Sequence, residues 1–126
     1  MREFAVIVLG NVSSRVARYL GENGFAVMAV DIDQVAVEAV QPYVTQAIQT
    51  DATIAGALDN LGFGDVDTAL VALGDDLESC VMVTMTLSEL EVPNIIVKGS
   101  SREQKAILEL LGANRVVFPE EDAAIR

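Results

Sequence analysis

The sequence predicts an α/β fold, a doubly wound sheet of six mostly parallel strands with helices on both faces. Short apolar runs alternate with helical patterns along the chain, which is the order of repeated strand-helix-strand units. Several runs, such as AVIVL and TALVAL, are apolar at consecutive positions, as expected of strands that helices cover on both sides. The expected strands are Glu3–Leu9, Ala26–Asp31, Thr45–Gln49, Thr68–Leu73, Asn94–Lys98 and Arg115–Phe118.

The first helix is expected after Gly10, with a single buried stripe. Its apolar residues recur at i, i+4, i+7 and i+8, and Gly24 follows at a position suited to a C-terminal cap. The stripe consists of Val12, Val16, Tyr19 and Leu20. The second helix is expected over Gln34–Gln41, because the proline at position 42 disfavours helical geometry in the residue before it.

Two further helices show the same apolar spacing. One is expected to open at Asp51 and Thr53, directly after the third strand, and the last is expected to end at Gly112. Their apolar positions are Ile54, Leu58 and Leu61 in the former, and Ile107, Leu108 and Leu111 in the latter.

The helix expected over Asp76–Leu90 carries apolar side chains around much of its circumference, more than packing on one side requires. A contiguous exposed apolar patch usually marks an interface, so we expect a homo-oligomer, either a dimer or a ring. Some of the following residues are expected in the contact: Cys80, Val83, Thr84, Met85 and Leu87. The spacing does not decide which of them face the core instead.

Composition narrows the possible functions. The 126 residues carry a net charge of −11 with only 8 Lys and Arg, which argues against a nucleic-acid partner. No apolar run approaches the roughly 18 to 20 residues of a membrane-spanning helix, so no direct membrane insertion is expected. The N-terminal sequence is expected to be a strand and not a signal peptide, and the single cysteine fits a reducing, cytoplasmic compartment. The C-terminal PEEDAAIR is expected to be a cut at the start of another helix.

The clearest functional spacing joins Gly10 to Asp31, which follows it by 21 positions. In Rossmann-like units, phosphates lie at the start of the first helix and an acidic residue about 20 positions later bonds the ribose. The GxGxxG fingerprint reads Val8, Gly10 and Ser13 here, so only its central glycine is retained. Gly10 is therefore either a phosphate-binding turn or an ordinary strand-to-helix turn.

Polar residues also follow the other strands. Asp31 is expected to accept the ribose hydroxyls, whereas Asp33 is expected to cap the second helix. Asp51 is either a helix cap or a contact to adenine or ribose. Lys98 suits a phosphate as a point charge, and Arg15 could reach the same phosphates, although each could equally be a solvated or salt-bridged surface residue.

Catalytic and metal chemistry have little support in the sequence. The chain has no histidine, which removes the commonest general base and metal ligand. Cys80 is expected to be a small buried hydrophobic residue and not a nucleophile. The acidic residues that begin at Glu120 are either a cation site or the solvated start of a helix.

With these residues assembled, the chain resembles the RCK/KTN family, whose N-terminal lobes are also called TrkA-N domains. The stretches that carry the resemblance are FAVIVLG, VMAVDID, QTDAT, VALGDDLESCVMVTMTLSELEVPNIIVKG and LELLGANRVVFPEED. The resemblance implies a single nucleotide-binding domain over residues 1–126, without the C-terminal lobe that usually follows. It also implies regulation of a membrane K⁺ channel or transporter by NAD(H), ATP or ADP.

Carried over to this sequence, the resemblance implies phosphates at Gly10 and Asn11, ribose at Asp31, adenine near Asp51 and Ala52, and Lys98 beside the phosphates. It also places Glu120 near a subunit interface, where a divalent cation is possible. The complete predicted nucleotide site is Gly10, Asn11, Val12, Ser13, Arg15, Asp31, Ile32, Asp51, Ala52, Thr53, Leu73, Gly74 and Lys98.

Three functions follow from these observations. The leading one is a non-enzymatic, nucleotide-sensing module that controls K⁺ transport through rearrangement of an oligomer. The second is a small NAD(P)-dependent oxidoreductase, disfavoured by the missing histidine and substrate domain. The third is a scaffold that has kept the fold and lost the ligand, which the departures at Val8 and Ser13 favour.

Overall fold

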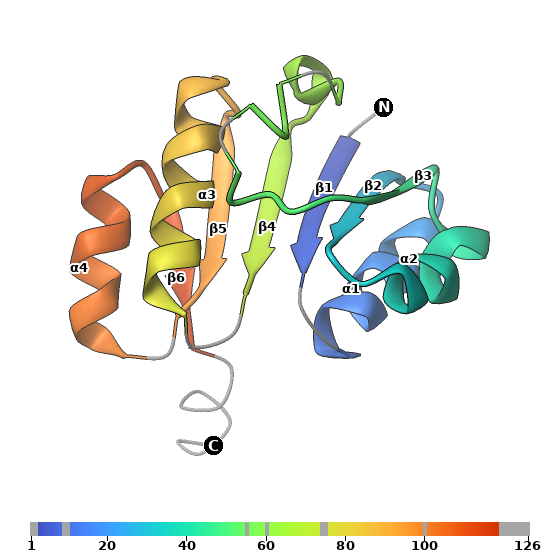
Figure 1. Cartoon of the computed structure of the whole chain (residues 1–126), viewed down its shortest axis with the longest axis horizontal. Coiled ribbons are helices and arrows are strands. Elements are labelled where there is room, and N and C mark those ends of the chain that lie inside the picture. Colours follow the sequence, from blue (N-terminus) through green and yellow to red (C-terminus); the bar gives the residue numbers. More distant parts are fainter. Residues whose placement is uncertain are drawn as a thin grey trace.

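The computed structural model describes residues 3–8, 11–54, 56–59, 61–73, 76–99 and 101–118. Within these ranges the chain forms one six-stranded sheet with the order β3-β2-β1-β4-β5-β6, and every neighbouring pair is parallel. Figure 1 shows β1 in the middle of this sheet. The strands are β1 (Glu3–Val8), β2 (Ala26–Asp31), β3 (Gln46–Gln49), β4 (Thr68–Ala72), β5 (Asn94–Lys98) and β6 (Arg115–Val117).

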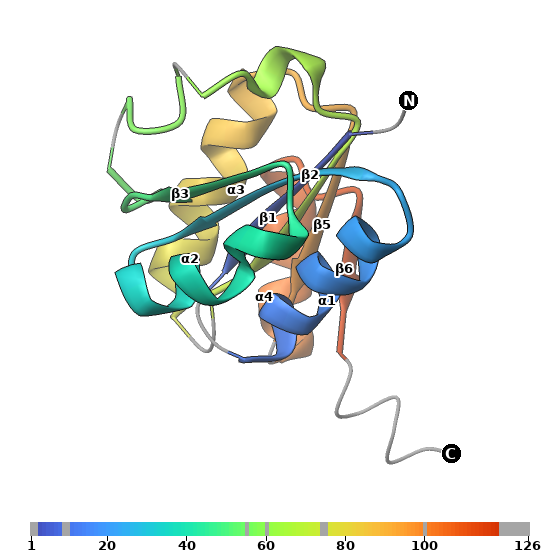
Figure 2. The same ribbon diagram turned by 90° about the vertical axis from the view of Figure 1, so that its right-hand side faces the viewer.

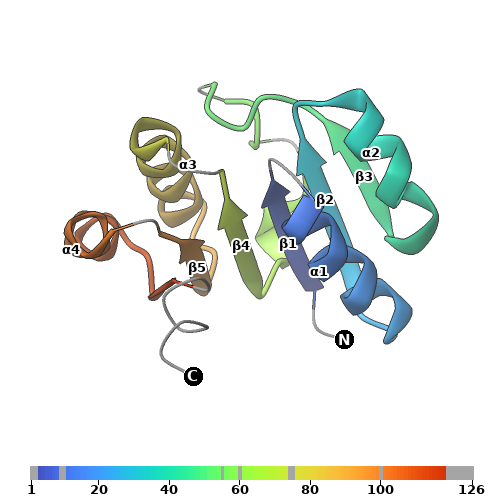
Figure 3. The same cartoon turned by 90° about the horizontal axis from the view of Figure 1, so that it is seen from below.

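Helices cover both faces of the sheet, so the predicted doubly wound, Rossmann-like architecture is confirmed. Alternate residues of β1 enter different hydrophobic cores, with Val6 in one and Ala5 and Ile7 in the other. The first core lies under α1 (Asn11–Glu22) and α2 (Gln34–Val40), which face the viewer in Figure 2. The second lies under α3 (Leu77–Glu89) and α4 (Arg102–Leu110), which lie side by side in Figure 3.

The buried face of the first helix agrees only in part with the stripe that its spacing predicts. Leu20 packs against the core as predicted, but Val16 and Tyr19 are 39% and 61% exposed, while Ala17 is completely buried. The reason is the close approach of α1 to the short 3₁₀ helix η1 (Gln41–Tyr43), where a Cβ on Gly21 would lie 1.7 Å from the carbonyl oxygen of Tyr43. Small residues permit that approach, so the packed face of α1 contains Ala17 and the partly buried Leu20 and Gly21, and Val16 and Tyr19 lie outside it.

The prediction of a helix that opens at Asp51 and Thr53 is wrong. The described residues between β3 and β4 form turns, followed by the 3₁₀ helix η2 (Phe63–Asp65), and their backbone bonds join residues three apart. Gly56 and Gly62 adopt positive φ values of 83° and 85°, which a right-handed helix does not contain. This segment still covers the face of the sheet on which α3 lies, because Leu58 is completely buried in the same core (Figure 1).

Three helices end in the same C-terminal motif. In α1, Gly24 has φ 87°, and the N–H groups of Gly24 and Phe25 donate to the carbonyl oxygens of Gly21 and Leu20. In α4, Gly112 has φ 122° and closes the helix in the same way, so both predicted glycine caps are confirmed. In α3 the corresponding position is Glu91, with φ 61°.

The apolar surface of α3 divides between the core and the exterior. Four of the residues proposed for an interface are buried in the domain itself, namely Cys80, Val83, Thr84 and Leu87. Met85 is 40% exposed and Met82 is 42% exposed, and Leu110 of the neighbouring α4 is 87% exposed. The excess apolar surface on this side of the molecule therefore comes from the methionines of α3 and from α4.

Candidate nucleotide-binding crevice

A crevice opens at the carboxyl ends of the central strands. The chain leaves β1 toward α1 on one face and leaves β4 toward α3 on the other, and ligands of open α/β sheets bind at such a point of divergence. The structure contains a cavity of about 140 Å³ there. Its lining residues come from β1, β2, α3 and the segments directly after β2, β3 and β4: Ile7, Val30, Asp31, Ile32, Thr50, Asp51, Ala52, Thr53, Leu73 and Ser79.

The Asp31 carboxylate lies in this crevice, at the end of β2, and is only 4% exposed. Its Oδ1 accepts a hydrogen bond from the backbone N–H of Asp33 at 3.0 Å. Its Oδ2 is buried and has no hydrogen-bond partner among the described residues. Burial raises the pKa of Asp31 above its ordinary value, and the nearby charge of Asp33 raises it further. A buried carboxylate oxygen without a donor is an incomplete site for a polar ligand.

Asp33 starts α2 and does not contribute to the crevice lining. Its Oδ1 accepts from the backbone N–H of Val35 at 2.9 Å, so the prediction that it caps the helix is confirmed. The intervening Ile32 lines the crevice and remains 49% exposed, which leaves an apolar side chain at the opening.

Asp51, Ala52 and Thr53 form one wall of the crevice. Asp51 Oδ1 accepts hydrogen bonds from the backbone N–H of Thr53 at 3.0 Å and from its hydroxyl at 2.6 Å, and these bonds lower the pKa of Asp51. Since no helix follows in the described residues, Asp51 caps a turn and not a helix. Both residues keep acceptor oxygens in the wall of the crevice.

The opposite wall comes from β4 and α3. Leu73, directly after β4, is 7% exposed and contributes to the apolar floor. Ser79 in the first turn of α3 also lines the crevice. Its hydroxyl donates to Asp76 Oδ2 at 2.7 Å and its backbone N–H to Asp76 Oδ1 at 3.3 Å, which makes Asp76 the N-cap of α3.

The profile of the TrkA-N domain family matches residues 4–119 of this chain. The chain belongs to the TrkA-N domain family. It is 36% identical over 125 residues to the Ktr system potassium uptake protein C of Bacillus subtilis, covering 99% of this chain and 57% of that protein. It is 33% identical over 125 residues to the Ktr system potassium uptake protein A of Vibrio alginolyticus, again covering 99% of this chain and 57% of the relative. The chain thus spans little more than half the length of these relatives.

Solved structures show the same fold. The NAD(P)-binding domain of an exopolyphosphatase-related protein from Archaeoglobus fulgidus superposes with a TM-score of 0.85 at 26% identity, covering 98% of this chain and 92% of that one. The TrkA-N domain of the inner membrane protein YbaL from Escherichia coli superposes with a TM-score of 0.84 at 14% identity, covering 98% of this chain and 91% of that domain. The GsuK channel bound to NAD superposes with a TM-score of 0.78 at 16% identity, covering 92% of this chain and 21% of the channel.

The structure brings together one part of the predicted TrkA-N nucleotide site. Six of its residues line the same crevice, namely Asp31, Ile32, Asp51, Ala52, Thr53 and Leu73. Asn11, Val12 and Ser13 form the start of α1, and their side chains lie outside the described part of the structure. Gly10, Gly74 and Glu120 lie outside the described residues altogether.

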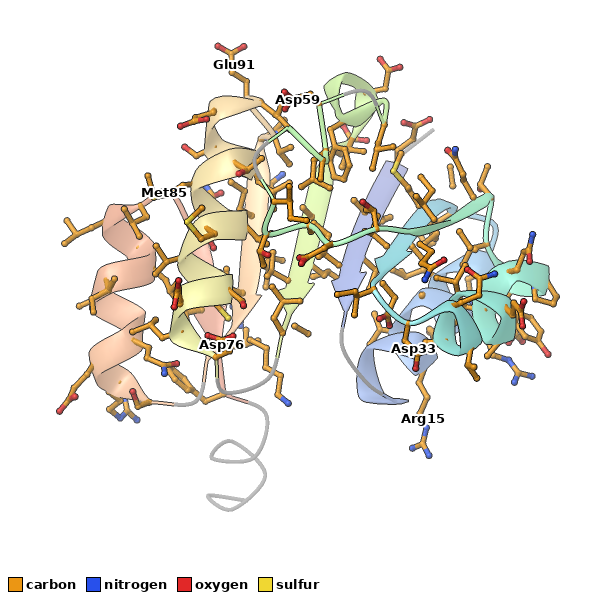
Figure 4. All side chains as sticks on the ribbon, viewed as in Figure 1. Arg15, Asp33, Asp59, Asp76, Met85 and Glu91 are labelled. Carbon is orange, nitrogen blue, oxygen red and sulfur yellow. The ribbon has the colours of Figure 1, made fainter. Side chains whose placement is uncertain are left out.

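The two predicted basic residues do not line the crevice. Arg15 is exposed, and Figure 4 shows its side chain extending away from the sheet below α1. Lys98 ends β5, on the far side of β4 from Asp31, and is half-buried. No group of three or more potential metal ligands occurs in the described ranges, and Cys80 is buried with a pKa raised by that burial. Nor does any described helix have the length and hydropathy to cross a membrane.

Ser79 was missed by the sequence reasoning. The pattern Asp-x-x-Ser at the start of a helix does occur at positions 76–79 and identifies a cap with its partner. The pattern does not reveal that this serine faces a crevice shared with β1 and β2, because that follows from how α3 lies across the sheet.

Proposed function

We propose that this chain is a nucleotide-sensing domain that binds an adenine nucleotide in the crevice, with Asp31 accepting hydrogen bonds from the ribose hydroxyls. The observation that carries the proposal is the Oδ2 atom of Asp31, which is buried, lies at the end of β2 and has no donor among the described residues. A carboxylate at this position of a Rossmann-like sheet is where ribose hydroxyls bind, and these hydroxyls are the donors that Oδ2 lacks.

The remainder of the crevice fits the base end of such a ligand. Ile7, Val30, Ala52 and Leu73 provide an apolar floor for a flat ring. The cavity of about 140 Å³ is smaller than the roughly 300–1,000 Å³ of whole ligand sites, so it suits a base with its ribose. The phosphates would lie toward Gly10 and the start of α1, where helix N–H groups favour anions. NAD(H), ATP and ADP share the adenosine that this crevice would hold.

We further propose that nucleotide binding controls K⁺ transport through a cytoplasmic assembly of these domains on a membrane K⁺ channel or transporter subunit. The 33–36% identity to Ktr potassium uptake proteins over nearly the whole chain supports this partner. The exposed apolar side chains of α3 and α4 support a homo-oligomer, either a dimer or a ring. A divalent cation near Glu120 remains a proposal from the family resemblance.

Calorimetric titration of NADH, NAD⁺, ATP and ADP tests the nucleotide site. Asp31→Ala removes the acceptor, and the loss of a charge-assisted hydrogen bond of about 1.5–3 kcal/mol weakens binding about 10- to 150-fold. Asp33→Ala is the matched control, because it removes a carboxylate two residues away that caps α2 and lies outside the crevice lining. Absence of heat with all four nucleotides would support the scaffold function instead.

An oxidoreductase is the second candidate, since NAD(P)-binding domains share this fold. We propose that the chain is not an enzyme, because the sequence has no histidine and the one cysteine is buried. Incubation with NADH or NADPH and a panel of ketones, aldehydes and 2-oxo acids provides the test. Sustained, protein-dependent loss of the absorbance of the reduced cofactor would show that this proposal is wrong.

A further inference from the structure

Two hydroxyl groups in the crevice direct their hydrogens to neighbouring carboxylates. Thr53 Oγ1 donates to Asp51 Oδ1 at 2.6 Å, and Ser79 Oγ donates to Asp76 Oδ2 at 2.7 Å. A hydroxyl has a single hydrogen, so each of these oxygens has only lone pairs left for a ligand. Both bonds are short and charge-assisted, which makes reversal of the hydroxyl unfavourable.

Asp76 fixes the orientation of Ser79 through two contacts. Its Oδ1 accepts from the backbone N–H of Ser79 while its Oδ2 accepts from the hydroxyl. These same bonds lower the pKa of Asp76, so the carboxyl group is ionised at neutral pH and can act only as an acceptor. Figure 4 shows Asp76 at the end of α3 that lies at the carboxyl edge of the sheet.

The polar side chains of the crevice therefore accept hydrogen bonds almost without exception. Asp31 and Asp51 are carboxylates, and the hydroxyls of Thr53 and Ser79 have already donated. The Thr50 hydroxyl has no hydrogen bond to another described residue and can turn to donate or accept. A ligand that fits this lining must present hydrogen-bond donors at its edges.

Asp31 and Ser79 line the same cavity from elements that are far apart in the sequence. Asp31 ends β2, Ile7 lies in β1, Leu73 directly follows β4, and Ser79 lies in α3. A purine whose ribose is held by Asp31 covers the apolar floor with its base. Ser79 lines the same cavity, so its acceptor oxygen can meet an edge of that base.

We propose that Ser79, held by Asp76, is a specificity-determining residue that accepts a hydrogen bond from the 6-amino group of a purine nucleotide. The inference rests on the proposed nucleotide site, for which the unpartnered, buried Oδ2 of Asp31 is an independent observation. Adenine carries an amino group at this position, whereas hypoxanthine carries a carbonyl oxygen. A carbonyl oxygen facing an acceptor-only hydroxyl leaves both groups without a hydrogen bond.

The test compares ADP with inosine 5′-diphosphate, two nucleotides with the same ribose and phosphates. Calorimetry on the 126-residue chain should show ADP binding about 10- to 100-fold more tightly, as expected when a mismatched base leaves buried polar groups unpaired. Ser79→Ala removes the acceptor, so ADP should lose affinity, inosine diphosphate should keep its affinity, and the ratio should approach one.

Asp76→Asn tests the direction of the hydrogen bond. Asparagine also caps helices well and has almost the same shape, but its amide nitrogen donates where Oδ2 accepted. The Ser79 hydroxyl then accepts from the amide and turns its hydrogen to the ligand, so inosine diphosphate should gain affinity and ADP should lose it. Ser88→Ala, at an exposed serine of the same helix, is the control and should leave the ratio unchanged.

Each other outcome contradicts the proposal in a distinguishable way. Equal binding of the two nucleotides by the wild type, with both weakened by Asp31→Ala, overturns the role of Ser79 and leaves the nucleotide site intact. An equal loss for both nucleotides in Ser79→Ala would assign the serine a structural role only. Absence of binding by either nucleotide overturns the nucleotide site and the role of Ser79 together.

Discussion

Gly21 of α1 lies against the backbone of Tyr43, so close that a Cβ at this glycine would be 1.7 Å from the Tyr43 carbonyl oxygen. The contact joins the first helix to the 3₁₀ turn that precedes β3. A β-carbon cannot be accommodated without moving one of the two backbones.

Gly21→Ala should therefore destabilise the domain by about 1–3 kcal/mol, the range typical of overpacking. Helix propensity alone gives the opposite sign, because alanine stabilises a helix interior by about 1 kcal/mol relative to glycine. Urea unfolding followed by circular dichroism decides between the two. An unchanged or higher midpoint would mean that α1 and η1 are not packed as described.

Glu91→Gly should stabilise the domain by about 1 kcal/mol. Glu91 occupies the left-handed position that closes α3, with φ 61°, where the corresponding residues of α1 and α4 are glycines. A left-handed conformation costs a residue with a Cβ roughly 1–2 kcal/mol, and glycine avoids that cost at some loss of chain entropy.

The reciprocal substitution Gly24→Ala, at φ 87° with open space around it, should destabilise the domain by a similar amount. Thermal unfolding of both variants should show opposite shifts.

The affinity for adenine nucleotides should fall at acidic pH. Burial raises the folded-state pKa of Asp31 above 3.8, so the folded domain without ligand takes up a proton at a higher pH than the unfolded chain does. Ribose hydroxyls donate to the ionised carboxylate, so protonation of Asp31 competes with binding. Calorimetry at a series of pH values should show weaker binding as the pH falls through the raised pKa. Asp31→Ala should bind weakly and without this dependence.

The same shift determines how stability changes with pH when no nucleotide is present. Because the folded-state pKa is raised, Asp31 destabilises the folded state wherever it is ionised, and this effect is relieved as the pH falls through the raised value. Asp31→Asn should therefore stabilise the domain at neutral pH. A loss of stability in this variant at pH 7 would mean that the buried carboxylate has a donor after all.

Leu110→Glu and Met85→Glu should dissociate the oligomer that we propose. These side chains are 87% and 40% exposed on α4 and α3, so a charge is hydrated in the free subunit and loses that hydration in a contact. Val35→Glu is the matched control, because Val35 is 73% exposed on α2, on the other face of the sheet. Size-exclusion chromatography with light scattering gives the mass. A wild type that is monomeric at tens of micromolar, or variants that keep the mass of the wild type, would place the assembly surface elsewhere.

Val83 and Leu87, which are also among the residues expected in the contact, do not suit this test. Both are completely buried against the sheet, so a glutamate at either position would unfold the domain before it reported on assembly. Periodicity identifies α3 as apolar on more than one side. It does not reveal which side faces the sheet, because that depends on how the helix lies across β4 and β5.

The strands were predictable because burial on both faces leaves a continuous apolar run, and Ala26–Asp31 and Asn94–Lys98 have the predicted bounds. In β3, β4 and β6 one end differs from the predicted bound by one residue. The helix expected after Asp51 has the right spacing of apolar residues, but two glycines in left-handed geometry turn the chain instead. Of the residues in that spacing, Leu58 is completely buried without a helix, whereas Ile54 is 60% exposed.

In the site, Asp31 was predictable from two features of the sequence. One is its interval from Gly10, and the other is its place at the end of a strand. Ser79 was not predictable, since its position in the crevice depends on three elements that are far apart in sequence. Lys98 ends a strand as Asp31 does, but β5 lies beyond β4, so the same pattern leads to a different place.

The pairing of β1 with β4 also has a consequence for how the molecule is made. Phe4 lies opposite Thr68, and between them the chain must complete β2, β3 and the turns that follow. During synthesis the first half of the sheet can form while β4 is still inside the ribosome, but the crevice does not yet exist, because Leu73 and Ser79 have not been added. Contacts so distant in sequence slow folding. A nucleotide bound in the crevice would therefore hold together segments that are far apart in the sequence and raise the melting temperature in proportion to the logarithm of its concentration.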